Sequence, residues 1–154
     1  MGVYEYEICS IQLDLASERR LVEEFLAAQQ LKLDSDVDYT LVVKSRGKPV
    51  GTGSLAGNVL KCIAVDPAYQ GEALTNKIVT ELELEAYYRE IEHLFLFTKT
   101  ENCTVFESLG FGRVVCTGRF GEGPGIALLE KPDGQVDMWL KALAASEAAG
   151  PATA

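Results

Sequence analysis

The chain has 154 residues, which fits one domain of ordinary size and excludes two full catalytic domains. Its net charge of −9 at pH 7 argues against nucleic acid or an anionic membrane as the main partner, because the long-range field repels polyanions. Four scattered cysteines and one histidine disfavour a metal site, and no stretch resembles a signal peptide or a membrane span. We therefore expect a cytoplasmic protein with reduced thiols.

The first half of the chain predicts one helix among several strands. The helix is capped by Ser17 and extends to about residue 31. Asp34, Asp36 and Asp38 alternate as in a calcium loop but lack its glycine and glutamate, so a solvated loop is predicted. Residues 46–49 predict a hairpin turn. Strands are predicted over 4–13, 39–44, 50–55 and 59–65.

The second half alternates helices with strands. Apolar residues at every fourth position predict a helix over about 75–89, and a shorter helix over 101–109 is stopped by Gly110. Strands are predicted over 93–97, 113–117 and 126–130. Together these elements predict a mixed α/β fold, with a mostly antiparallel sheet of six to seven strands flanked by helices.

Near the C-terminus, Val136, Trp139, Leu140 and Leu143 stand at i, i+3, i+4 and i+7, the apolar spacing of an amphipathic helix. This helix could pack on the protein's own sheet or on a neighbouring molecule, so an oligomer is possible and the sequence does not decide. The chain is accordingly divided into a domain over 1–131, a helix over 132–147 and a flexible tail or linker over 148–154.

The stretch from Asp66 to Val79, DPAYQGEALTNKIV, joins a buried strand to a helix. A helix N-terminus offers unpaired backbone N–H groups and a partial positive charge, which suit a phosphate even in an acidic protein. Lys77 could add an ammonium group in the same turn. The spacing alone is equally that of an ordinary strand-to-helix connection that binds nothing.

The segment IAVDPAYQGEALTNKIVTEL resembles the acyl-CoA-binding motif of the GNAT superfamily, the GCN5-related N-acetyltransferases, and ENCTVFESLGFGRV resembles the second motif of that family. The segments GTGSLAGNVLKCIAVDPAYQGE, HLFLFTKTEN and FESLGF are also similar to the N-terminal, GNAT-like domain of citrate (pro-3S)-lyase ligase. The resemblance implies the GNAT acyl-CoA N-acyltransferase fold and acetyl-CoA or CoA as substrate or ligand.

The resemblance also implies which residues hold the cofactor. The backbone of one strand would pair with the pantetheine arm, the following loop and helix would surround the pyrophosphate, and two residues of the second motif would lie beside the pantetheine. In that order the implied residues are Ile63, Ala64 and Val65; Gln70, Gly71, Glu72, Ala73, Leu74, Thr75 and Asn76; and Asn102 and Phe106.

Several positions depart from the GNAT pattern. Ala73 and Thr75 replace small residues of the loop, and the added methyl of Ala73 would restrict positive φ and close approach, so we expect binding weakened by about 1–3 kcal/mol. Phe106 stands where many GNAT enzymes place a proton-donating tyrosine, and Asn58 and Val59 occupy the neighbourhood of the usual glutamate base. No catalytic residue is assigned, although transfer by proximity with water as proton carrier remains possible.

Three functions stay open at this point. The first is an N-acetyltransferase acting on an unidentified small-molecule or protein amine. The second is a non-catalytic CoA-binding or regulatory domain of a citrate lyase ligase system, whose partners would be a ligase domain or citrate lyase subunits. The third is a scaffold without cofactor. Ligase chemistry is not expected of this chain alone, because His93 is its only histidine and an HxGH-type signature is absent.

Overall fold

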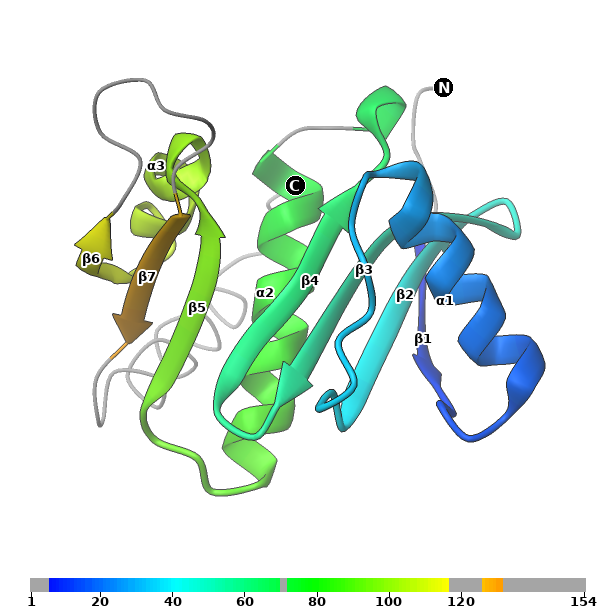
Figure 1. Cartoon of the computed structure of the whole chain (residues 1–154), viewed down its shortest axis with the longest axis horizontal. Helices are drawn as coiled ribbons and strands as arrows, with labels where there is room; N and C mark the ends of the chain where they lie inside the picture. Colours follow the sequence, from blue (N-terminus) through cyan, green and yellow to red (C-terminus); the bar gives the residue numbers. More distant parts are fainter. Residues whose placement is uncertain (1–5, 70–71, 117–125, 132–154) are drawn as a thin grey trace, which may run out of the picture. The chain divides into compact units, whose positions relative to one another are not determined.

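The computed structural model describes residues 6–69, 72–116 and 126–131, and the chain divides into two compact units, Met1–Leu82 and Glu83–Ala154. The elements of the first unit are β1 (Tyr6–Ile11), α1 (Ala16–Ala28), β2 (Tyr39–Ser45), β3 (Lys48–Ala56), β4 (Val59–Val65), the 3₁₀ turn η1 (Pro67–Tyr69) and the first part of α2 (Glu72–Tyr88) (Figure 1). The second unit holds the rest of α2, then β5 (Leu94–Lys99), the 3₁₀ turn η2 (Thr100–Asn102), α3 (Cys103–Glu107), β6 (Gly112–Cys116) and β7 (Ile126–Lys131).

The strands of the first unit follow one another as an antiparallel meander in the order β1, β2, β3, β4. Strands β2 and β3 meet at a turn of only two residues, Arg46 and Gly47, whose φ angles are 54° and 79°. Two positive φ values are typical of the tight hairpin turns that match the right-handed twist of paired strands. The prediction of a longer turn over 46–49 is therefore wrong, because Lys48 and Pro49 already pair in β3.

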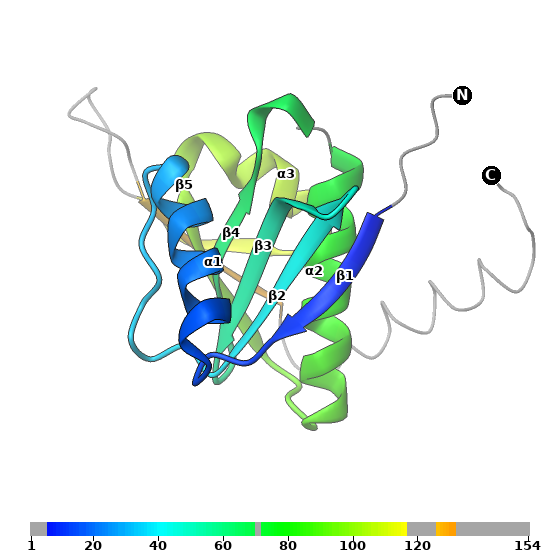
Figure 2. The same cartoon turned by 90° about the vertical axis from the view of Figure 1, so that its right-hand side faces the viewer.

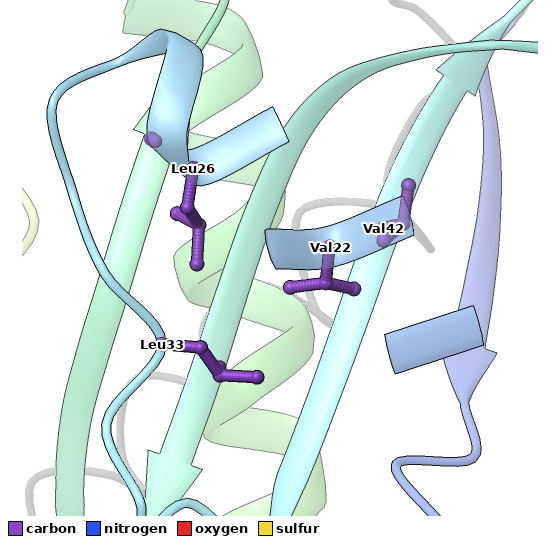
Figure 3. Packing of buried hydrophobic residues seen from close by; sticks show 5 residues of the cluster. Val22, Leu26, Leu33 and Val42 are labelled. Atoms are coloured by element: carbon purple, nitrogen blue, oxygen red, sulfur yellow. The ribbon is translucent and has the colours of Figure 1, made fainter. Parts of the chain in front are cut away.

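Helices lie on opposite sides of these strands (Figure 2). On one face, Val22 and Leu26 of α1 pack with Leu33, Val42 and Ala64 in a buried apolar cluster (Figure 3). The spacing of four between Val22 and Leu26 places both side chains on one side of the helix. The first unit thus has the layered α/β architecture that the sequence predicts.

On the other face, α2 lies close to β3, and glycine makes this approach possible. A Cβ atom at Gly53 would lie 2.5 Å from Cγ2 of Ile78 and 2.9 Å from Cδ1 of Leu82. A Cβ at Gly51 would lie 2.9 Å from Cδ1 of Ile78 and 3.7 Å from Cδ2 of Leu74. The two glycines of the VGTGSL strand therefore set how closely α2 packs on the sheet.

Helix α1 begins one residue before its predicted cap. Leu15 occupies the N-cap position, so Ser17 lies inside the first turn and the prediction of a serine cap is wrong. Instead, the carboxylate of Glu18 accepts a hydrogen bond of 2.8 Å from the backbone N–H of Gln12. This bond ties the first turn of α1 to the end of β1, in the manner of an acidic side chain that reaches back from a helix start.

The strands of the second unit pair antiparallel in the order β5, β7, β6. Leu94, Leu96 and Leu129 are fully buried on one face of this sheet, together with Phe106 and Leu109 from the region of α3. The predicted helix over 101–109 is divided into η2 and the five residues of α3. Helix α3 ends at Glu107, two residues before the predicted end, and the chain turns at Gly110, whose φ is +100°.

In the part of the chain that the structure describes, seven strands and the flanking helices confirm the predicted α/β class, and each strand pairing given above is antiparallel. The predicted C-terminal helix and the tail lie outside the described residues. The proposed domain boundaries accordingly stay predictions. Among the described helices, none combines the length and the apolar character that crossing a membrane requires.

Candidate functional site

In one stretch of its pairing with β3, strand β4 has one residue more than its partner. Thr52 pairs with Ala64 and Ser54 with Lys61, so two steps along β3 face three steps along β4. Cys62 lies in this irregular segment with φ +54°, and the hydroxyl of Thr52 donates a hydrogen bond of 3.1 Å to its carbonyl oxygen. A β-bulge bends a strand and redirects its peptide groups. The bulge therefore directly precedes the predicted pantetheine strand at 63–65.

The end of β4 is fixed by Asp66. Its backbone N–H donates to the carbonyl oxygen of Val50 at 2.8 Å, which closes the strand against β3. Its side-chain Oδ1 accepts from the N–H of Ala68, and its carbonyl oxygen accepts from the N–H of Tyr69, each at 2.8 Å. These three bonds form a tight turn that leads from β4 toward α2. Gln70 and Gly71, the next two predicted site residues, lie outside the described residues.

Helix α2 begins at Glu72, three residues before the predicted start. Ala73 and Asn76 are exposed, Thr75 is half-buried, and Leu74 is buried against the sheet. The backbone N–H groups of the first helical turn have no acceptor within the helix and carry its partial positive charge. Because Ala73 is helical, it needs no positive φ, and the objection that it lacks the conformational freedom of glycine is wrong.

The two predicted residues of the second motif have different surroundings. Asn102 is exposed at the N-cap of α3, where its side chain forms no capping hydrogen bond with the described residues. Phe106 is 5% exposed and packs in the core of the second unit. The structure therefore brings 63–65 and 72–76 onto consecutive elements of the first unit and Asn102 and Phe106 onto one helical segment of the second. Their roles toward a cofactor stay predictions.

Neither residue at the position predicted for a general base carries a carboxylate. Asn58 lies exposed in the turn between β3 and β4, and Val59 is half-buried at the first position of β4. Both residues stand at the end of β4 opposite to the turn at Asp66. They give no support to an acid–base role in this part of the fold.

A buried ion pair that the sequence did not predict lies in the second unit. The ammonium of Lys131 is 2.8 Å from Oε2 of Glu83 and donates a second bond of 2.8 Å to the carbonyl oxygen of Leu109. The same ammonium lies 4.8 Å from the centroid of the Phe111 ring. Both charged side chains are essentially inaccessible to solvent. Lys131 thus joins β7, α2 and the turn that follows α3.

Burial is the largest cause of the pKa shifts of both Glu83 and Lys131. It raises the pKa of Glu83, and the nearby Lys131 opposes that rise only in part. It lowers the pKa of Lys131, again against the attraction of the carboxylate. Within the described part of the chain, Oε1 of Glu83 has no hydrogen-bond partner. The pair therefore carries a desolvation cost that makes each member dependent on the other.

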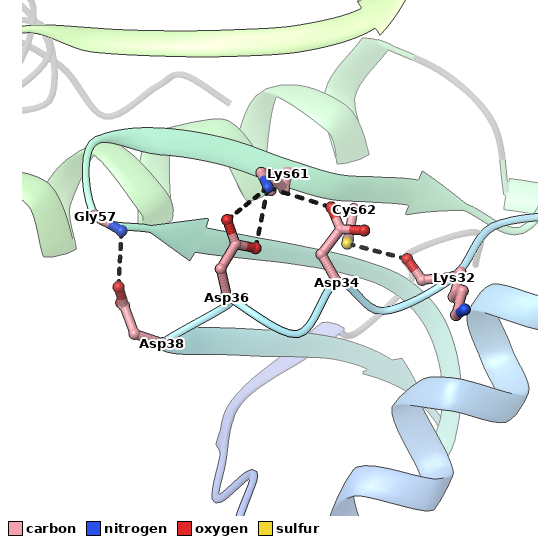
Figure 4. Close-up of polar contacts among 7 residues, drawn as sticks. All are labelled: Lys32, Asp34, Asp36, Asp38, Gly57, Lys61 and Cys62. Atoms are coloured by element: carbon pink, nitrogen blue, oxygen red, sulfur yellow. Dashed lines mark hydrogen bonds and ion pairs between the residues drawn. The ribbon is translucent and has the colours of Figure 1, made fainter.

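The three aspartates after α1 fasten their loop to the neighbouring strands (Figure 4). Lys61 of β4 lies 2.9 Å from a carboxylate oxygen of Asp36 and 3.4 Å from one of Asp34, and Asp38 accepts a bond of 2.7 Å from the N–H of Gly57. The hydrogen bond to Asp36 raises the pKa of Lys61. Across residues 6–69, 72–116 and 126–131, His, Cys, Asp and Glu side chains form no cluster that could hold a metal ion.

The thiol of Cys62 lies under this loop. Its Sγ atom donates a hydrogen bond of 3.5 Å to the carbonyl oxygen of Lys32, and burial raises its pKa. A thiol with a raised pKa stays protonated near neutral pH and is a poor nucleophile. Cys62 is therefore a structural residue of the bulge.

Comparisons with known proteins agree with this geometry. No family model matches the chain. The chain is 42% identical to citrate (pro-3S)-lyase ligase from Klebsiella pneumoniae over 100 residues, which are 65% of this chain and 29% of that protein. It is 33% identical to the ligase of the same name from Escherichia coli over 108 residues, which are 70% of this chain and 29% of that protein. The chain thus spans about 29% of the length of these curated relatives.

Solved structures of acetyltransferases share the fold. The ribosomal-protein-S18-alanine N-acetyltransferase from Escherichia coli matches with a TM-score of 0.61 at 19% identity over 84% of this chain and 94% of that one. A GCN5-related N-acetyltransferase from Rhodopseudomonas palustris matches with a TM-score of 0.58 at 19% identity, over 86% of this chain and 97% of that one. The yncA protein from Salmonella typhimurium, solved with its cofactor acetyl-CoA, matches with a TM-score of 0.57 at 17% identity, over 84% of this chain and 93% of that one.

These findings define the chain first as a protein with the GNAT acyltransferase fold. Within that class it is a homologue, over part of their length, of the citrate lyase ligases. Both steps confirm the resemblance that the sequence motifs carry.

Proposed function

We propose that this protein binds acetyl-CoA and transfers its acetyl group to an amine. One observation carries the proposal: the bulged strand β4 ends in the turn at Asp66, and α2 begins at Glu72 directly after it. The end of a strand followed closely by a helix N-terminus offers backbone groups for a pantetheine amide and for a pyrophosphate on consecutive segments. The neighbour yncA, which has acetyl-CoA as its cofactor, supports the same ligand.

In this proposal the chain's own residues bind and orient the donor. The backbone of Ile63, Ala64 and Val65 pairs with the pantetheine arm, and the first N–H groups of α2 face the pyrophosphate. Thr75 and Asn76 lie in the first part of the same helix, and Gln70 and Gly71 keep their predicted role toward the pyrophosphate. The role of Asn102, which is exposed at the N-cap of α3 in the second unit, stays a prediction. Because net charge is −9, local N–H groups and Lys77 supply the attraction for phosphate.

The reaction would be direct transfer. The amine nitrogen attacks the thioester carbonyl, the new C–N bond forms as the C–S bond breaks, and the proton lost by the amine passes through water to the departing thiolate. Phe106 has no proton to give and is buried, so this step relies on proximity. We therefore expect slow turnover compared with enzymes that position an acid and a base.

The buried Phe106 favours one alternative, a domain that binds CoA without turnover in a citrate lyase ligase system. The identity with citrate lyase ligases supports a ligase domain or citrate lyase subunits as its partners. A cytoplasmic location is part of both proposals.

Calorimetric titration with CoA and acetyl-CoA, followed by a thiol-release assay with a panel of small amines and lysine peptides, separates the two functions. Binding with amine-dependent release of CoA is the expected result. Binding without release from any amine would favour the alternative. No heat with either ligand at millimolar concentration would contradict both.

A further inference from the structure

Strands β5 and β7 carry apolar residues on both of their faces. β5 begins LFLF and β7 contains ALL, whereas a sheet with one solvated face alternates apolar with polar residues. Leu94 and Leu96 point to the face that α3 and the buried lysine cover, and both are fully buried. Continuous apolar runs of this kind are typical of strands that are covered on both sides.

The opposite face of this sheet carries Phe95, Phe97 and Leu128, which are here called the outer face, and the register places Glu130 and Lys99 on the same side. Phe97 pairs directly with Leu128 across β5 and β7, which places their side chains on the same side. Phe97 is 52% exposed, and Phe95 and Leu128 are half-buried. The ring of His93 stacks on Phe95 at 4.6 Å between centroids and its Nε2 lies 2.8 Å from Oε1 of Glu130, so a polar pair borders the outer face.

The segment that follows β7 has apolar side chains that could cover the outer face. Val136, Trp139, Leu140 and Leu143 have the spacing of one helical stripe, and their segment begins only five positions after Lys131, the last residue of β7. No other stretch outside the described residues combines four apolar residues larger than alanine at this spacing. Its apolar stripe and the outer face are thus two apolar surfaces close together in the chain.

The lengths of β7, of the linker after it and of the predicted helix also permit the helix to lie on the outer face. From Leu128 to Lys131, β7 advances about 10 Å, and a helix from Val136 to Leu143 would advance about 10 Å in return. The four residues Pro132 to Gln135 can span about 13 Å when extended, which is enough to lift the chain from the sheet onto a helix of about 10 Å diameter. Loops of two to six residues commonly make such reversals.

We propose that the segment 136–143 of this same chain folds as a helix and docks on the outer face, with Trp139 against Phe97. Its attachment to β7 favours this occupant over a second copy, because a short linker gives an effective concentration of about millimolar. Proteins in solution at micromolar concentration cannot match that. From the sequence, this helix could pack on the protein's own sheet or on a neighbouring molecule. The apolar outer face is the reason to choose the protein's own sheet.

Trp139 is the only tryptophan, so its fluorescence reports the docking without interference. We expect emission at short wavelength and weak acrylamide quenching, both unchanged on dilution of the protein. The variant Phe97→Asp should shift the emission to longer wavelength and increase quenching. Tyr88→Asp is the matched control, since Tyr88 is 71% exposed on α2 and lies outside the outer face; it should leave the emission unchanged.

Three results would overturn the proposal: solvent-exposed Trp139 in the wild type, burial that disappears on dilution, and emission that Phe97→Asp leaves unaltered. Burial that disappears on dilution would indicate a second copy as the occupant. If Phe97→Asp fails to fold by circular dichroism, a photoreactive benzoylphenylalanine at position 97 replaces it. A mixture of isotopically heavy and light protein then distinguishes crosslinks within one chain from crosslinks between chains. The proposal requires crosslinks from position 97 to 136–143 within one chain. Crosslinks between chains, or to another segment, would contradict the docking.

Discussion

Lys131 neutralises a carboxylate that has no access to water. Replacing it by methionine keeps most of the side-chain volume but leaves Glu83 buried without its cation, and this costs about 3–5 kcal/mol of unfolding free energy. Urea denaturation measures the loss. Lys61→Met is the matched control, because the partners of Lys61 are more than half exposed and such a pair contributes about 0.2–1 kcal/mol. Equal losses in the two variants would contradict the account.

The same substitution predicts a pH dependence. Without Lys131, burial holds the pKa of Glu83 above its usual value in the folded state only. The folded protein then binds one proton more than the unfolded chain between the two pKa values, so stability falls as pH rises through this window and levels off above it. The deficit of Lys131→Met relative to the wild type should therefore be smaller at about pH 5 than at about pH 8. A deficit independent of pH would contradict the assignment to Glu83.

Single residues were predictable where their role is local. Gly110 follows the predicted helix in the sequence, and the chain turns there with a positive φ that glycine adopts readily. Glu83 lies beside the apolar repeat of α2, but its partner is 48 positions away and no local pattern connects them. The sequence also could not reveal that Phe106 is buried, because an aromatic residue fits a core and a ligand channel equally well.

At the scale of elements, Gly53 sets the distance between β3 and α2. Gly53→Ala would place a Cβ atom 2.5 Å from Ile78 and 2.9 Å from Leu82, so the helix must shift or the side chains must leave their rotamers. We expect a loss of about 1–3 kcal/mol, measured by thermal or urea unfolding. Gly112→Ala is the control, because a Cβ atom there meets nothing within 4 Å. A neutral Gly53→Ala would show that α2 packs less closely than described.

Elements were predicted best where one face or both are apolar throughout. The strand VLKCIAV was placed at its observed bounds, because its run of apolar residues ends at Asp66 and Pro67. Its bulge was missed, since an extra residue shows only in the pairing with β3. The start of α2 was placed three residues late because Glu72 and Ala73 are compatible with either a loop or a helix. Because of this difference Ala73 lies in the helix, where it needs no positive φ to be compatible with the candidate site.

At the scale of the whole molecule, an acidic protein is proposed to bind an anionic ligand. The net charge of −9 opposes the phosphates of CoA at long range, so binding depends on the local field at the start of α2. The chain corresponds to about 29% of its curated relatives, and the proposed binding concerns this part alone. A change of charge confined to the first turn of α2 therefore tests the proposal more sharply than a change in overall charge.

The most direct test compares the affinities for CoA and for pantetheine, which lacks the pyrophosphate, in Ala73→Asp and Ser17→Asp by calorimetry. Ala73 and Ser17 are both exposed and are the second residues of α2 and α1, so aspartate is compatible with either helix start. We predict that Ala73→Asp weakens CoA binding about tenfold or more and leaves pantetheine binding unchanged, whereas Ser17→Asp alters neither. Wild-type affinity for CoA in Ala73→Asp would contradict the claim that the start of α2 holds the pyrophosphate.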